Sequence, residues 1–429
     1  MVQKRREFLK VAGGAVALGL TARNHRALAG PSPNGRINVG FIGVGNMGTQ
    51  RLKDFMEHAD VRVAALCDVD EERRNKAASL VESEKKPRPP LFGDYRRLLE
   101  SKDVDAVCIA TPDHWHALTT IHSCQAGKDV FVEKPLCHTI PEGRAMVEAA
   151  ARNRRITQLG NHIHNDLPNY RRVVEIVKSG MLGTVDRVCC WKTSGRRDIG
   201  NPPNGTPPAG LDYDFWLGPA PKRAFNPNRC HSRFRNFWDY SGGVFIDFWC
   251  HVSDLAYWAL DLQSPTTVSS IGARKLADNG ETPTMLDVQY EFPGGLVMTW
   301  NIHPQGLAGF ETYNLGCVFQ GSEGTLLADY ETHKLFVKGK EVPEFQRPSQ
   351  TIADSPGHVR EFLDSIQSRQ PTTCNVEYAH RLTKAGLLGN IAYRSGTKLT
   401  WDDRGERITG EKSARRLLSR KYRKPWRLG

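Results

Sequence analysis

The sequence predicts an α/β protein with two folded domains, the first built on a parallel sheet and the second an α+β domain with a large, mostly antiparallel open sheet. Three observations support this prediction. Between residues 37 and 155, short apolar runs alternate with helix-like segments, a pattern typical of parallel sheets. After about residue 156, amphipathic helices are followed by several strand-like runs. The length of 429 residues allows two or three domains, and the composition of 39% hydrophobic and 25% charged residues is ordinary for a globular protein.

The net charge of +12 is confined to the two ends of the chain. Residues 1–29 carry +5 and residues 411–429 carry +7, so the body between them has no net charge. A nucleic-acid-binding protein usually has a basic face on its folded body, so we expect no nucleic-acid partner. No apolar stretch approaches the roughly 18 residues of a membrane span. The ten cysteines include no C-x-x-C pair, so we expect neither a disulfide framework nor a zinc site, and we expect folding in a reducing compartment.

Residues 1–29 are expected to be a cleaved export signal that takes no part in the fold. Two arginines, Arg5 and Arg6, precede Phe8-Leu9-Lys10, a weak apolar core occupies residues 11–20, and Ala27-Leu28-Ala29 offers a cleavage site near Ala29. The twin arginine resembles the Tat type of signal, which predicts an interaction with the Tat export machinery and a periplasmic location. The alternative is a basic, fraying N-terminus.

The first element of the fold is an apolar strand that begins at Ile37 and ends at Ile42, directly before Gly43-Val44-Gly45-Asn46-Met47-Gly48. A G-x-G-x-x-G motif between a strand and a helix is the phosphate-binding turn of a dinucleotide-binding domain. Gly43 permits the tight turn, Gly45 lets the backbone approach the pyrophosphate, and Gly48 allows close packing of helix and strand. The alternative is a structural βαβ unit without a ligand.

The second strand, residues 61–67, ends at Asp68, twenty residues after Gly48. A carboxylate there accepts hydrogen bonds from the ribose hydroxyls of NAD and repels the 2′-phosphate of NADP. No arginine follows within the stretch CDVD, so the sequence favours NAD over NADP.

Two further strands carry polar residues to the same edge of the predicted sheet. Residues 104–110 precede Thr111-Pro112-Asp113-His114-Trp115-His116, and residues 128–132 precede Glu133 and Lys134. Ligands of open α/β sheets bind at the carboxyl ends of the strands, so we expect these residues at the cofactor. His114 and His116 have no partners at metal-ligand spacing, and Glu133-Lys134 can also be an ordinary solvated strand end.

These four features together resemble the Gfo/Idh/MocA family, the relatives of glucose–fructose oxidoreductase and inositol dehydrogenase. The features are G-x-G-x-x-G, the acid after the second strand, A-T-P-x-x-x-H, and E-K-P. The resemblance implies a Rossmann domain over residues 30–155 and oxidoreductase activity with NAD(P). The expected cofactor contacts are Gly43, Gly45, Asn46, Met47, Gly48, Asp68, Thr111, Pro112, Asp113, His114, His116, Glu133, Lys134 and Asn161.

The second domain is expected to cover residues 156–405. An amphipathic helix within residues 169–185 stops at Gly180, and a Pro/Gly-rich loop covers residues 195–230. A helix then opens after Gly242-Gly243 and runs to about residue 260. Strand-like runs follow at residues 284–292, 295–303, 315–319 and 325–337, and they predict the broad antiparallel sheet.

Asp247 and His251 share one face of that helix because they are spaced i, i+4. From spacing alone they can be a polar stripe or a pair of zinc ligands, but no third ligand stands at a recognisable distance, so we expect no metal. The segment also matches G-G-x-x-x-D-x-x-x-H of the same family, which implies that Lys134, Asp247 and His251 are the catalytic group. Neutral His251 can accept a hydroxyl proton and Lys134 can stabilise an alkoxide, while Asp247 orients His251 or binds a neighbouring hydroxyl.

The substrate pocket is the region where the sequence departs from the family pattern. After Asn161 the chain reads HIHND, so His162 and His164 are expected to tune the substrate site. The aromatic residues Trp216, Trp238 and Tyr240 can either stack on a sugar ring or belong to the core.

Residues 406–429 form a basic C-terminal arm with interleaved Leu417, Leu418 and Trp426. A free tail gains nothing from exposed apolar side chains, so we expect the arm to pack on a neighbouring subunit of a homodimer or homotetramer rather than to be solvated.

Three functions remain open. The first is a sugar or polyol oxidoreductase with tightly held NAD. The second is a redox-neutral glycosidase that oxidises one sugar carbon, eliminates the glycoside and returns the hydride. The third is a non-catalytic sugar-binding relic, which is opposed by the joint presence of Gly43, Gly45, Asp68, Lys134, Asp247 and His251. Export of a folded protein away from soluble NAD favours a cofactor that is loaded first and regenerated in its own site.

Overall fold

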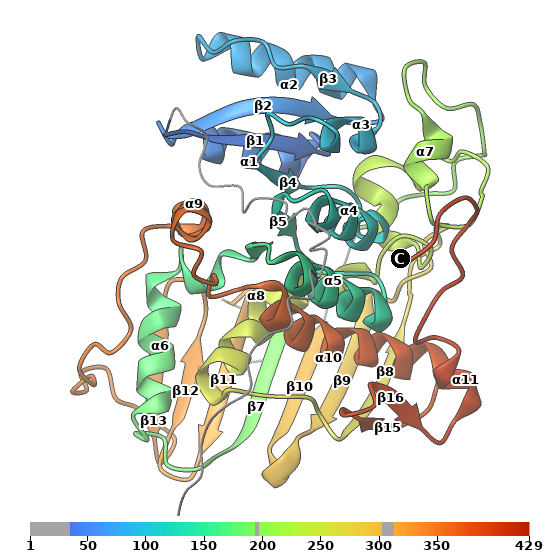
Figure 1. Ribbon diagram of the computed structural model, residues 1–429. Coiled ribbons are helices and arrows are strands. Elements are labelled where there is room, and N and C mark those ends of the chain that lie inside the picture. Colours follow the sequence, from blue (N-terminus) through green and yellow to red (C-terminus); the bar gives the residue numbers. More distant parts are fainter. Residues whose placement is uncertain (1–34, 194–196, 303–312, 429) are drawn as a thin grey trace, which may run out of the picture.

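A computed structural model describes residues 35–193, 197–302 and 313–428 (Figure 1). The expected signal at residues 1–29 lies outside the described residues. Within them the chain forms two sheets, one parallel and one mostly antiparallel, and helices cover both. The predicted fold class is confirmed. None of the described helices combines the length and apolarity needed to cross a bilayer.

The first sheet has six parallel strands in the order β3-β2-β1-β4-β5-β6. Its strands are β1 (Ile37–Ile42), β2 (Val61–Cys67), β3 (Leu91–Phe92), β4 (Ala106–Ile109), β5 (Asp129–Glu133) and β6 (Thr157–Gly160). Its helices are α1 (Asn46–Met56), α2 (Glu71–Ser83), α3 (Tyr95–Leu99), α4 (Asp113–Gln125) and α5 (Ile140–Asn153). Because β6 pairs with β5, the sheet of the first domain continues beyond the predicted boundary at residue 155.

Local sequence explains where the helices of this domain begin. The Asp70 side chain accepts a hydrogen bond from the Arg73 amide and starts α2. Thr139 and Glu142 form a capping box at the start of α5, with a proline in its first turn. These caps set the positions at which the loops leave the sheet.

The second sheet has ten strands in the order β14-β13-β12-β11-β7-β10-β9-β8-β15-β16, and only β7 and β10 pair in parallel. The strands are β7 (Val185–Lys192), β8 (Thr267–Ala273), β9 (Met285–Glu291), β10 (Val297–Ile302), β11 (Leu315–Gly321), β12 (Thr325–Ala328), β13 (His333–Val337), β14 (Lys340–Glu341), β15 (Leu399–Asp402) and β16 (Arg407–Thr409).

The ten cysteines of the chain are all free, and Cys190 is buried while its neighbour Cys189 is half-buried.

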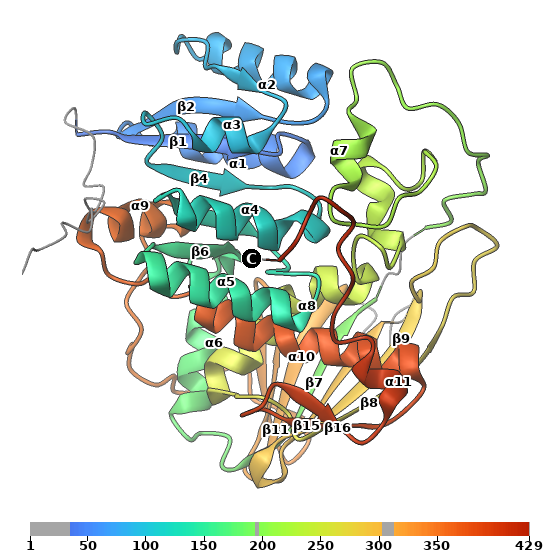
Figure 2. The ribbon, with the colours of Figure 1, turned by 45° about the vertical axis from the view of Figure 1, so that its right-hand side comes forward.

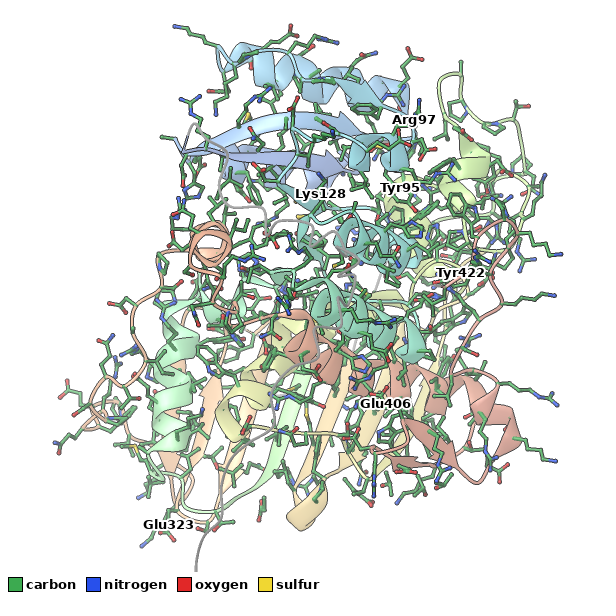
Figure 3. The ribbon with its side chains drawn as sticks, in the orientation of Figure 1. Tyr95, Arg97, Lys128, Glu323, Glu406 and Tyr422 are labelled. Atoms are coloured by element: carbon green, nitrogen blue, oxygen red, sulfur yellow. The ribbon has the colours of Figure 1, made fainter. Side chains whose placement is uncertain are left out.

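Helices α6 (Pro168–Lys178), α8 (Gly243–Leu260) and α10 (Val376–Ser395) belong to the second domain. Figures 1 and 2 show α8 and α10 between the large sheet and α5 of the first domain. Glu406, labelled in Figure 3, joins these layers: it accepts from Arg144 of α5 at 2.9 Å and bonds His380 of α10 at 2.7 Å. Burial alone would raise the pKa of Glu406, but the hydrogen bonds from His380 and Arg144 lower it.

Helix α9 (His358–Ser368) lies in the second half of the chain but packs on the first domain. Phe362 contacts the rings of Phe55 and Phe131, with centroids 6.3 and 5.8 Å away. Arg360 forms an ion pair of 2.8 Å with Asp60. The core of the first domain is therefore completed by a helix that the sequence analysis did not foresee.

The basic C-terminal arm lies against its own chain, and its expected packing on a neighbouring subunit stays a prediction. Helix α11 (Lys412–Arg415) follows β16, and Leu417, Leu418 and Trp426 lie against the main hydrophobic core. These apolar side chains are half-buried against their own chain, and Arg420 and Arg423 of the arm donate hydrogen bonds to α4 and α7 (Tyr213–Leu217).

Candidate active site

The glycine-rich turn after β1 has the tight geometry predicted for it. Gly43 has φ of +84°, and a Cβ at this position would lie 2.7 Å from the carbonyl oxygen of Ala110. A Cβ on Gly48 would overlap the carbonyl oxygen of Gly43. A Cβ on Gly45 would meet only the guanidinium of Arg73. The first and third glycines thus allow backbone to pack on backbone, while the second leaves room above the turn.

These surroundings predict different effects for two alanine substitutions. Gly48→Ala should lower the free energy of unfolding by about 1–3 kcal/mol, because the backbone it meets cannot move aside. Gly45→Ala should leave stability nearly unchanged, because the far end of Arg73 can swing away, but its methyl group should weaken NAD binding. Urea unfolding and NAD titration measure the two effects. Equal loss of stability in both variants would contradict this assignment.

Asp68 lies where a ribose-binding carboxylate is expected. Its oxygens accept hydrogen bonds from the amides of Val44, at 2.8 Å, and Asp70, at 3.0 Å. Burial raises the pKa of Asp68, while these two amide bonds and Arg73 act in the opposite direction. The bonds fix the carboxylate beside the glycine turn. Arg73, which the sequence analysis did not select, also lines the cavity there.

A cavity of about 280 Å³ runs along the carboxyl ends of the parallel strands. Aromatic side chains from both domains form one wall, and polar residues from the glycine turn and the ends of β4 and β5 form the other. The predicted cofactor residues that line the cavity are Gly43, Gly45, Asn46, Met47, Asp68, Thr111, Pro112, Asp113, Glu133 and Lys134. The glycine turn, the adjacent Asp68 carboxylate and the position of the cavity at the carboxyl ends of the strands fit a dinucleotide.

Three predicted cofactor residues point elsewhere. The His114 Nε2 bonds the carbonyl of Trp216 at 2.9 Å, and His116 bonds the carbonyls of Pro135 and Thr111. Asn161 donates to Asp254 at 2.7 Å. All three are buried and none lines the cavity, so they brace its walls from behind. Position at a strand end was a correct guide to the place of these residues but not to the direction of their side chains.

Lys134 and Asp247 meet at the junction of the two domains. Lys134 follows β5, and Asp247 stands in the second turn of α8. The Lys134 Nζ donates to the Asp247 carboxylate at 2.7 Å and to its backbone carbonyl at 3.1 Å. Arg235 donates to the same carboxylate oxygen at 3.1 Å. One carboxylate thus fixes two cations beside the cavity.

His251 lies one helical turn beyond Asp247. Burial lowers the pKa of His251 well below its ordinary value, and the nearby charges of Lys134 and His162 lower it further, while Asp247 opposes them. Its Nδ1 is buried without a hydrogen-bond partner among residues 35–193, 197–302 and 313–428. The imidazole is therefore neutral near pH 7, which is the form that can accept a proton.

The predicted substrate residues fall into two groups. His162 lies beside His251, with ring centroids 5.4 Å apart, and Trp216 lines the cavity. His164 instead stacks on Trp258 at 4.3 Å, and its Nε2 is 3.2 Å from Asp254, so it belongs to a buried network.

Tyr240 and Trp238 also lie away from the dinucleotide cavity. Tyr240 is fully buried against His114 and Trp216, each with its ring centroid within 5.3 Å, which favours the core alternative for this residue. Trp238 lines a separate cavity and packs beneath the guanidinium of Arg394, 4.9 Å from its ring centroid.

Sequence reasoning missed Arg235 and Tyr330. Arg235 lies just before α8 in a short 3-10 helix, and the ring of Tyr330 lies 6.2 Å from that of His162. Neither residue stands in a motif. Only the folded path of the loops brings them to this place, although an arginine twelve residues before Asp247 was visible in the sequence.

The fold and this cavity define an NAD-binding protein of the dinucleotide-dependent oxidoreductase type. The family model described as "Oxidoreductase family, NAD-binding Rossmann fold" matches residues 37–161, and "Oxidoreductase family, C-terminal alpha/beta domain" matches residues 169–428. The chain belongs to the Gfo/Idh/MocA oxidoreductase family, as the sequence motifs predicted.

Among curated proteins, similar sequences include a glycosyl hydrolase family 109 protein of Shewanella putrefaciens and an alpha-N-acetylgalactosaminidase of Shewanella oneidensis. They are 32% and 31% identical over 204 and 205 residues, and each match covers 42% of this chain and 43% of the relative. The matches thus span less than half the length of these relatives.

Solved structures with the same fold include two dehydrogenases. The WlbA dehydrogenase of Bordetella pertussis, in complex with NADH and UDP-GlcNAcA, has a TM-score of 0.64 at 17% identity and covers 86% of this chain and 99% of its own. The scyllo-inositol dehydrogenase of Lactobacillus casei, with NAD(H) and scyllo-inositol, has a TM-score of 0.60 at 18% identity and covers 85% and 99%.

Proposed function

We propose that the protein is an NAD-dependent oxidoreductase acting on a CH–OH group of a sugar, a polyol or a sugar derivative. The observation that carries the proposal is the meeting of Lys134 from the first domain with Asp247 of the second domain at the edge of the dinucleotide cavity. His251 stands one turn away in its neutral form.

The side chains divide the proton chemistry between them. When bound, NAD would supply the acceptor for the hydride of the carbinol carbon. His251 accepts the hydroxyl proton, and the Lys134 ammonium stabilises the negative charge that develops on the oxygen. Asp247 holds Lys134 in place, and Arg235 holds the carboxylate from its other side. In this arrangement Asp247 orients Lys134, which differs from the orientation of His251 expected from the sequence.

A redox-neutral glycosidase is the second candidate, and the names of the curated relatives favour it. Both relatives cited above are glycoside hydrolases by name. In this scheme NAD would hold the hydride taken from one sugar carbon while the same residues handle the hydroxyl proton, the activated glycoside eliminates its aglycone, and the hydride returns to the sugar. Both candidates need a cofactor that stays in its site.

One experiment separates the candidates. The mature protein is purified, its absorbance is recorded near the reduced-nicotinamide band, and candidate sugars and aryl glycosides are added. Stoichiometric reduction that a second sugar reverses supports the oxidoreductase. Release of aglycone without net reduction supports the glycosidase. A protein that binds no NAD and shows no spectral change with any sugar would overturn both and favour a non-catalytic sugar-binding protein.

We also propose that the protein is exported through the twin-arginine route with its cofactor already bound. The support is the leader anatomy of residues 1–29 beside a dinucleotide site, since this route carries folded proteins. Cell fractionation tests the location, and a purely cytoplasmic protein with an intact leader would contradict it.

A further inference from the structure

The aromatic wall of the dinucleotide cavity is formed in part by a short cover segment, residues 210–218, that includes α7. Phe215 and Trp216 of this segment line the cavity. The cover segment comes from the second domain but lies on the first: the Gly210 carbonyl accepts from the Glu71 amide at 3.0 Å, and the Asp212 amide donates to the Val69 carbonyl at 3.0 Å. A dinucleotide in the cavity would lie beneath it.

The end of the chain lies across the outside of this cover. We call residues 416–428 the strap; in Figure 2 it is the dark red segment that rises from α11 to α7 and turns back towards α4. Tyr422 of the strap is labelled in Figure 3 where the strap passes alongside the first domain. Cover and strap are therefore neighbours that are some 200 residues apart in the sequence.

Arg423 binds the strap to the end of α7. Its guanidinium donates to the carbonyl of Gly218 at 2.9 Å, to the carboxylate of Asp214 at 2.7 Å and to the carbonyl of Asp214 at 2.6 Å. Its backbone amide donates to the carbonyl of Pro219 at 3.0 Å. These carbonyls belong to the last turn of α7 and the loop after it, so one side chain ties down the whole end of the cover.

Trp426 supports the cavity wall from behind. Its ring meets Trp115 edge to face, with centroids 4.8 Å apart, and Phe215 at 5.4 Å. Both of these rings line the dinucleotide cavity. The guanidinium of Arg96 lies 5.1 Å from the Trp426 ring and closes the stack on the outer side. Edge-to-face pairs of this kind add to the energy of burial, so the strap holds the two wall rings in one arrangement.

The base of the strap is anchored to the first domain by a buried ion pair. Arg420 donates to the carboxylate of Glu142 at 2.8 Å and to the carbonyl of His114 at 2.6 Å. The Tyr422 hydroxyl donates to the same Glu142 oxygen at 2.6 Å. The Glu142 side chain is 1% exposed, so breaking this anchor leaves a buried charge without a partner. The strap is thus fixed at one end and pressed on the cover at the other.

We propose that the strap is a clasp that slows release of the bound dinucleotide, with Arg423 and Trp426 as positioning residues of the cofactor site. To leave, the dinucleotide must pass the cover, and lifting the cover breaks the Arg423 and Trp426 contacts. The inference rests on the proposed function only in taking NAD as the occupant of the cavity. It gives the basic C-terminal residues a role within one subunit.

The test is the rate at which bound NADH leaves the full-length mature protein. The protein is loaded with NADH and mixed with a large excess of NAD⁺, and the loss of bound-NADH fluorescence is followed. The double variant Arg423→Ala/Trp426→Ala should release NADH at least tenfold faster than the wild-type protein. Arg427→Ala is the matched control, since Arg427 is exposed and makes no ion pair or hydrogen bond among the described residues, and its rate should be unchanged. The single variant Trp426→Phe, which keeps Arg423 and an aromatic ring, should release NADH at a rate much closer to that of the wild-type protein than to that of the double variant.

Release at the wild-type rate from a folded double variant would overturn the proposal. If the double variant does not fold, the single variant Trp426→Leu takes its place with the same expected direction and the same contrary result. The outcome is independent of the reaction: faster release from a protein that reduces no NAD with any sugar would keep the clasp and reject the proposed function. An NADH release rate equal to that of the wild-type protein, from a double variant that still oxidises a sugar, would reject the clasp and keep the proposed function.

Discussion

Lys134→Met should lower the rate of hydride transfer about 10²–10³-fold while NAD remains bound. Methionine keeps the length and volume of the side chain but removes the ammonium that stabilises charge on the substrate oxygen. Asp247 keeps its partner Arg235, 3.1 Å away, so its carboxylate is not left unpaired. Single-turnover reduction of the cofactor measures the rate, and NADH fluorescence measures occupancy.

The matched control for this variant is Lys102→Met, which removes an exposed lysine from the same domain. Its rate and its cofactor content should equal those of the wild-type protein. Normal hydride transfer in Lys134→Met would remove Lys134 from the catalytic group. Loss of NAD in this variant would instead show that the lysine acts mainly in cofactor binding, which its place on the cavity wall also allows.

The second large effect concerns His251 and pH. Because burial and the charges of Lys134 and His162 lower its pKa well below 6.5, the proton-accepting form should persist at neutral and mildly acidic pH. The expected profile of kcat/KM is therefore flat from pH 7 down through pH 6.5, and it falls only at lower pH, where His251 becomes protonated. Substitution by glutamine should remove this acid limb and reduce the rate by about 10²–10⁴-fold.

An acid limb centred at or above pH 6.5 would contradict the assignment, since it would report a base in a solvent-like environment. His58→Gln is a suitable control because His58 lies in the loop between α1 and β2, and its replacement should leave the profile unchanged. The pH profile also distinguishes His251 from a purely structural residue, whose loss would lower stability without removing one ionisation from the rate.

Much of the fold could be predicted because its signals are local. The glycine turn, the acid after β2 and the strands β1, β2, β4, β5 and β9 to β13 follow from short local patterns, whereas the other strands of the two sheets were not selected from the sequence. Lys134, Asp247 and His251 could be selected because each stands in a motif. Lys134 and Asp247 meet in the structure and His251 lies one helical turn beyond Asp247, whereas their catalytic roles stay predictions.

The remainder depends on contacts that no short pattern encodes. Arg235 reaches Asp247 through the path of the short segment between its 3-10 helix and α8, and Arg423 reaches α7 across 209 residues of sequence. His114, His116 and Asn161 were placed at the right strand ends, but buried carbonyls and carboxylates nearby compete for their polar atoms and turn them from the cavity. Which hydrogen-bond partner each side chain takes depends on the packing around it, and short sequence patterns do not specify that packing.

The position of α9 near the end of the sequence has a consequence for folding during biosynthesis. Phe362 completes the hydrophobic core around Phe55, and the pair Arg360–Asp60 spans 300 residues. During translation the N-terminal sheet therefore emerges long before the helix that seals it. A nascent chain cannot finish this domain, whatever its local propensities, until about residue 370 has left the ribosome. Fragments truncated before α9 would lack the Phe362 contacts and leave Phe55 and Phe131 more exposed to solvent, which favours aggregation.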